Sequence, residues 1–181
     1  GHVMTGKGVV PYLTPLKINS LVDAIAQGIT EAAEPDAYRF VKEFYSIDGT
    51  LGTAFYLMLT VATASLVTIC DKDNANGLAK LVAFSGNTIR VIGVERTPSL
   101  DYVPVTLSFI DSDLILAMPN AKAFQLNQFA QHNPIRIVLA ARIHDEANVT
   151  IFAPKTADNN AVALAIGGTR NNGSVSMGLI L

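Results

Sequence analysis

The stretch GTLGTAFYLMLTVATASLVTIC, residues 49–70, decides how the rest of the chain is interpreted, because its 22 residues carry no charge. That length could cross a bilayer. The stretch nevertheless contains five Thr and one Ser, and Phe55, Leu57 and Leu59 share one parity. Such alternation is typical of a strand or a pair of strands. It therefore disfavours a membrane span, while an apolar helix stays open as a third interpretation.

The same period of two is expected through the second half of the chain, where turn-forming residues such as Ser85-Gly86-Asn87 separate short apolar segments. One helix is expected from Pro119 to Gln131, since proline suits the first turn of a helix. The expected strands are 78–84, 88–94, 102–110, 114–117, 135–143, 149–152, 161–166 and 174–181.

Residues 1–48 are expected to form a helical N-terminal segment. Thr14-Pro15 resembles a helix start, and apolar residues recur at helical spacing from position 18 to position 29. A second helix should follow Glu34-Pro35-Asp36, where acidic side chains favour the positive end of the helix dipole. The predicted fold is α+β and mainly β: one domain, 1–181, with a helical pair before an antiparallel β-sandwich or barrel core at 49–181.

Composition favours self-association. Half of the residues are hydrophobic and only 15% are charged, whereas about 25% is usual for a soluble domain. A surface rich in uncharged side chains is readily desolvated, so a homo-oligomer is expected. The net charge of −2 gives no general attraction to nucleic acid. No signal peptide is recognised, and a soluble protein without a cofactor is expected.

The polar segment ICDKDNANGL, residues 69–78, suggests a calcium site formed by Asp71, Asp73 and Asn76, but the spacing does not match an EF-hand loop. A tight hairpin turn at Asn76-Gly77 is the competing interpretation. Cys70 precedes two acidic residues, which would oppose a thiolate, so it is expected to be an inert structural residue.

Three further groups are candidate sites. Arg142, His144, Asp145 and Glu146 hold acid, base and cationic groups within five residues and are the candidate catalytic site. Gly167, Gly168, Thr169, Arg170 and Asn171 could form an anion-binding loop. Arg90, Arg96 and Arg136 could share one basic strand face.

The resulting functional hypothesis is a non-enzymatic, self-associating structural or recognition module of the coat, fibre-tip or surface-assembly type, such as a virion component. A protein or a glycan would be its partner. The alternatives are a small enzyme with its site around Arg142, and a protein that binds a small molecule or an anion.

Overall fold

A computed structural model describes residues 1–47, 50, 52–97, 106–107, 110–141 and 162–166. Its elements, in chain order, are β1 (His2–Thr5), β2 (Leu16–Ile18), α1 (Leu21–Ala26), α2 (Pro35–Ser46), β3 (Phe55–Thr60), α3 (Leu66–Cys70), α4 (Leu78–Phe84), β4 (Val91–Val94), β5 (Thr106–Leu107), β6 (Ile110–Asp111), α5 (Ser112–Ala130), β7 (Arg136–Ala141) and β8 (Val162–Ile166).

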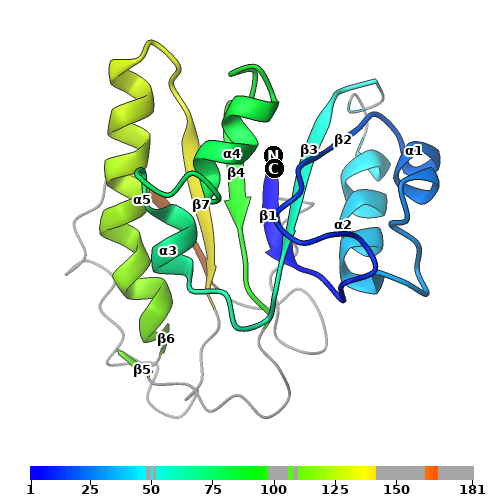
Figure 1. Cartoon of the computed structure of the whole chain (residues 1–181), viewed down its shortest axis with the longest axis horizontal. Coiled ribbons are helices and arrows are strands. Elements are labelled where there is room, and N and C mark those ends of the chain that lie inside the picture. Colours follow the sequence, from blue (N-terminus) through cyan, green and yellow to red (C-terminus); the bar gives the residue numbers. More distant parts are fainter. Residues whose placement is uncertain (48–49, 51, 98–105, 108–109, 142–161, 167–181) are drawn as a thin grey trace.

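The main sheet has six strands in the order β2-β3-β1-β4-β7-β8 (Figure 1). The β1–β3, β1–β4, β4–β7 and β7–β8 pairs are parallel, and only β2 runs antiparallel, at the edge beside β3. A separate short antiparallel pair joins β5 to β6. The predicted mainly-β sandwich or barrel is therefore wrong, because the chain forms an α/β fold with a mostly parallel sheet.

Helices cover both faces of this sheet. One core cluster packs β1 and β3 against α1 and α2, and Phe40 and Phe44 from α2 lie against Phe55 of β3. The other cluster packs the opposite face against α3, α4 and α5, which lie to the left of β1 in Figure 1. Because both faces are covered, all six residues of β3 are buried. The uncharged run thus contains a central strand followed by the helix α3.

The N-terminal segment departs from the expected helical pair. Its first residues form the central strand β1, and residues 16–18, expected to be helical, form the edge strand β2. The helix α1 begins later, where the Ser20 side chain accepts a hydrogen bond from the Asp23 N–H. The second expected helix is confirmed as α2, with Pro35 in its first turn.

The expected antiparallel meander is also wrong. Residues 78–84 form the helix α4, whose buried Leu78, Leu81 and Val82 follow helical spacing. Asn76-Gly77 is not a type I′ hairpin turn, because Gly77 has a φ of −93° and precedes α4. A Cβ atom at Gly77 would lie 2.3 Å from the Ile69 carbonyl oxygen. The glycine is therefore required by the close approach of α3, and not by a positive φ.

Residues 114–117, expected to be a strand, belong to α5, which continues through Pro119. An internal proline costs about 3 kcal/mol. The buried stripe of Leu114, Ala117, Ala121 and Phe124 extends on both sides of the proline and keeps the helix continuous. The strands expected at 135–143 and 161–166 are confirmed as β7 and β8. Those expected at 149–152 and 174–181 lie outside the described residues.

Within the described part of the chain, no helix is both long enough and apolar enough to span a membrane.

Candidate functional site

The carboxyl ends of the central strands are where a ligand would be expected. After β1 the chain forms β2 and β3 on one side of that strand and later β4 on its other side, so the sheet order reverses at β1. Open parallel sheets bind ligands at this reversal, outside the carboxyl ends of the strands. Thr5, Thr60 and Val94 end the three strands there.

The loop after β1 points several backbone N–H groups toward one carboxylate. Glu34 accepts hydrogen bonds from the N–H groups of Lys7 at 2.6 Å, Val9 at 3.0 Å and Val10 at 3.3 Å. Its side chain comes from the residue before α2, and Glu34 is only 1% exposed. In other doubly wound folds this turn binds phosphate. Here the Glu34 carboxylate accepts the hydrogen bonds of these N–H groups, so they are not available to bind an external anion.

Beyond the end of β4, Arg96 lies between two aspartates. Its guanidinium donates hydrogen bonds to Asp111 and, at 3.1 Å, to Asp113. Asp113 also accepts from the Ser65 hydroxyl at 2.8 Å and the Leu66 N–H at 2.6 Å, so it caps α3 from another part of the chain. The Arg96 side chain is 9% exposed. This cluster connects the starts of α3 and α5 to the end of β4, and its groups are engaged in structural contacts.

A cavity of about 310 Å³ opens beside this cluster, between the end of β3, the loop at Tyr12 and α3. Thr60 and Ile69 are buried in its lining, while Tyr12 and Thr68 lie at its more exposed side. The described residues that line it carry no charge. Its location corresponds to the carboxyl edge where ligands are expected.

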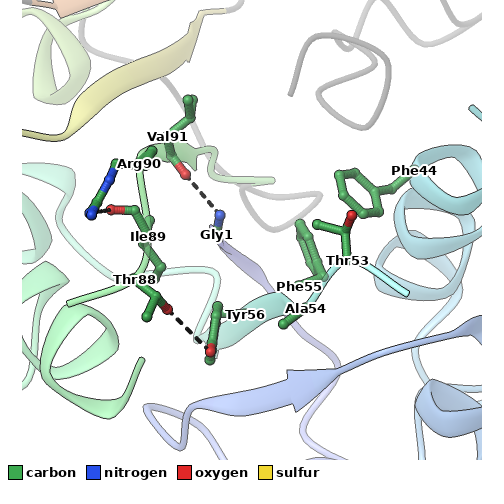
Figure 2. A pocket seen from close by; sticks show the side chains of 10 residues that line it. All are labelled: Gly1, Phe44, Thr53, Ala54, Phe55, Tyr56, Thr88, Ile89, Arg90 and Val91. Atoms are coloured by element: carbon green, nitrogen blue, oxygen red, sulfur yellow. Dashed lines mark hydrogen bonds between the residues drawn. The ribbon is translucent and has the colours of Figure 1, made fainter. Parts of the chain in front are cut away.

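A second cavity, of about 370 Å³, lies at the opposite edge of the sheet (Figure 2). Several polar groups in its lining are bonded within the protein. The Gly1 nitrogen donates to the Val91 carbonyl at 2.8 Å, and the Thr88 hydroxyl lies 3.3 Å from the Tyr56 hydroxyl. The amino ends of parallel strands are not the usual ligand edge. The carboxyl-edge cavity is therefore the stronger candidate.

The structure does not bring the three candidate arginines onto one face. Arg90 and Arg136 lie together at the amino ends of β4 and β7, where the Arg136 N–H donates to the Arg90 carbonyl at 2.8 Å. The Arg90 guanidinium also donates to Asn133 at 2.7 Å. Arg96 lies beyond the other end of β4, in the aspartate cluster.

The loop that holds Asp71, Asp73 and Asn76 connects α3 to α4. Asp71 accepts from the Asp73 N–H at 3.0 Å, and Asp73 pairs with Lys72 at 2.6 Å. Across the residues that the structure describes, no group of three or more His, Cys, Asp or Glu side chains is arranged to hold a metal ion.

Cys70 is buried at the end of α3, a helix and not the expected strand. Burial, reinforced by the negative charge of Asp113, raises the pKa of its thiol to about 12. At about pH 8 the native thiol should therefore react with a disulfide reagent roughly 10³-fold more slowly than the same thiol in unfolded chain. Stopped-flow absorbance in buffer and in denaturing guanidinium measures the ratio. Equal rates would show that Cys70 is accessible.

The outer side of α5 is apolar. Leu116, Pro119, Ala123, Leu126 and Ala130 follow one another at alternating spacings of three and four residues, as in the seam of a coiled coil. Leu116 is 59% exposed and Leu126 is 54% exposed. Phe129, which flanks this seam, is 68% exposed. The opposite side packs into the core, so α5 is apolar on both sides, which is typical of a helix buried between two bodies.

Two predicted sites fall outside the described residues: the candidate catalytic group Arg142, His144, Asp145 and Glu146, and the candidate anion loop Gly167, Gly168, Thr169, Arg170 and Asn171.

The sequence interpretation missed Glu34, the aspartate cluster and the α5 seam. A signal for the seam was present, because Leu116 and Ala123 lie one heptad apart, as do Pro119 and Leu126. The contacts of Glu34 and Arg96 span 24 or more and 15 or more residues respectively, and no local pattern marks them.

Fold and site together define a doubly wound α/β protein with a carboxyl-edge cavity and an exposed apolar helix. Searches of family models, curated proteins and solved structures found no match to the chain.

Proposed function

We propose that this protein is a self-associating structural module in which α5 of one copy packs against α5 of a second copy. The observation that carries the proposal is the exposed apolar outer side of α5, where Leu116 and Leu126 of the seam and the flanking Phe129 are each more than half exposed. Exposed apolar patches on a folded protein are typical of interaction surfaces. The low charged fraction of the chain, 15%, supports the same conclusion.

The shape of the seam fits a second copy. In an antiparallel pair centred on Ala123, the Leu116 of each copy lies opposite the Ala130 of the other, so a large side chain meets a small one. The small Ala123 at the centre lets the two helices approach closely. Within α5 the only charged residues are Asp113 and Lys122. Neither belongs to the seam, so the seam residues themselves are uncharged.

Sedimentation equilibrium at micromolar concentrations tests the proposal. The wild-type chain should show twice its 19.2 kDa mass or more. Phe129→Glu and Leu126→Glu should each return the single-chain mass, because a carboxylate would have to be desolvated in the interface. Val22→Glu is the matched control, since Val22 is 76% exposed on α1, away from the seam. It should leave the oligomer mass unchanged.

A cross-linking measurement tests the arrangement itself. With Ala123→Cys near the two-fold axis, mild oxidation should give a covalent dimer, whereas Val22→Cys should not. Cys70 is buried and does not interfere. A wild-type chain that stays monomeric throughout the micromolar range would refute self-association. An oligomer unaffected by both glutamate substitutions would refute the α5 interface.

A further inference from the structure

We propose that the carboxyl-edge cavity binds a neutral, polyhydroxylated ligand of about the size of one sugar ring. The inference goes beyond self-association and rests on different residues. The volume of the cavity, about 310 Å³, lies at the lower end of the range of small-molecule sites, about 300–1,000 Å³, so the ligand is small.

The polar groups of the cavity are neutral and can both donate and accept. The Thr68 hydroxyl makes no hydrogen bond to the described residues. Among the residues that the structure describes, the Asn76 side chain has one hydrogen bond, a 3.5 Å contact from Lys80 to its oxygen, so its amide N–H groups have no partner among them. The Tyr12 hydroxyl lies 3.5 Å from the Gly6 carbonyl, at the limit of hydrogen bonding. Hydroxyl groups of a sugar suit this set because they also donate and accept.

Neighbouring contacts hold the lining in place. The side chain of Asn74 donates to the Thr68 carbonyl at 2.8 Å and accepts from the Asn76 N–H at 3.0 Å. These bonds fix the loop that carries Asn76 against α3. Leu13, Val61 and the Tyr12 ring add apolar surface, which suits the C–H face of a sugar ring.

The same geometry disfavours other ligand classes. An anion would need a cation or a group of N–H donors, but Arg96 is engaged by two aspartates and the loop after β1 is occupied by Glu34. A purely apolar ligand would leave the hydroxyl and amide groups of Thr68 and Asn76 desolvated without partners.

Two-dimensional ¹H–¹⁵N NMR titration tests the proposal with D-glucose and N-acetyl-D-glucosamine as neutral probes and glucose 6-phosphate as the anionic comparison. At least one neutral probe should shift the amide signals of Tyr12, Thr68 and Asn76, with a dissociation constant of about 1–10 mM for so small a ligand. Glucose 6-phosphate should bind more weakly than glucose.

Substitutions locate the contact. Thr68→Val keeps the side-chain shape, removes one hydroxyl and should weaken binding about 5-fold. Asn76→Ala should have a similar effect. Thr63→Val is the matched control, because Thr63 is exposed nearby and does not line the cavity. The proposal fails if neither neutral probe shifts these signals, if the phosphate ester binds more tightly than glucose, or if Thr68→Val and Thr63→Val bind equally.

Discussion

Replacing Arg96 with Met should lower the free energy of unfolding by about 3–5 kcal/mol. The substitution keeps an unbranched apolar side chain in place of the aliphatic part of Arg96 but removes the guanidinium. Asp111 and Asp113, whose side chains are 13% and 19% exposed, then face each other's charge without the cation between them. The loss should be large because removing one partner of a buried ion pair leaves the other charge uncompensated. Urea denaturation followed by far-UV circular dichroism measures it.

The chain provides a matched control for this experiment. Arg39 pairs with Asp36 at 2.6 Å on the surface of α2, where the two side chains are 44% and 31% exposed. Arg39→Met removes the same group from a solvated pair and should cost at most about 1 kcal/mol. If both substitutions cost the same, the Arg96 cluster does not hold α3 and α5 to the end of β4.

A second substitution in the same cluster tests the connection that Asp113 makes between α3 and Arg96. Asp113→Asn retains the side-chain shape, but its amide cannot accept the hydrogen bonds from Ser65, Leu66 and Arg96 together. Combined with Arg96→Met in a double-mutant cycle, it should cost less than the sum of the two single substitutions, because they disrupt one network.

The sequence predicted α2, β7 and β8 because each is a local pattern. The uncharged run at 49–70 led to the wrong prediction of a mainly-β core for a physical reason. A strand covered on both faces has no polar side. Tyr56 and Met58 are buried as well as Phe55, Leu57 and Leu59, so the alternation of these residues did not indicate a strand with one solvent-exposed face. A short, continuous apolar run followed by a helix is typical of a parallel sheet.

The helix α4 was missed for a related reason. Its seven residues, LAKLVAF, are too few for periodicity to separate helix from strand, and the Asn-Gly pair before them favoured a hairpin. The need for glycine at position 77 arises from the nearby Ile69 carbonyl oxygen. That close approach exists only once α3 and α4 are packed together.

The candidate site was the least predictable part, because its side chains act away from their own local elements. Glu34 was expected to favour the start of α2 through the helix dipole. The structure instead turns its carboxylate toward the loop after β1. Arg96 was assigned to a basic face. Its partners, Asp111 and Asp113, lie 15 and 17 residues further along the chain, after the strand expected at 102–110. Long-range polar contacts of this kind require the fold to be known first.

Glu34→Ala should lower the free energy of unfolding by about 2–4 kcal/mol, since it leaves the N–H groups of Lys7, Val9 and Val10 without their acceptor in a partly buried loop. Glu34→Gln should cost less, because its amide oxygen can still accept one or two of these bonds. Glu31→Ala, at an exposed position in the turn before α2, is the control and should change stability by less than about 0.5 kcal/mol.

Chemical rescue distinguishes the proposed role of Glu34 from a general packing loss. In Glu34→Ala the N–H groups of the loop should donate hydrogen bonds to a small carboxylate from solution. Added acetate should therefore raise the melting temperature of the variant more than chloride at the same ionic strength. The wild-type protein should show no such difference, because its own carboxylate already fills the position. A variant that loses stability but responds equally to acetate and chloride would show that burial of the Glu34 side chain, and not anion binding by the loop, stabilises this edge of the sheet.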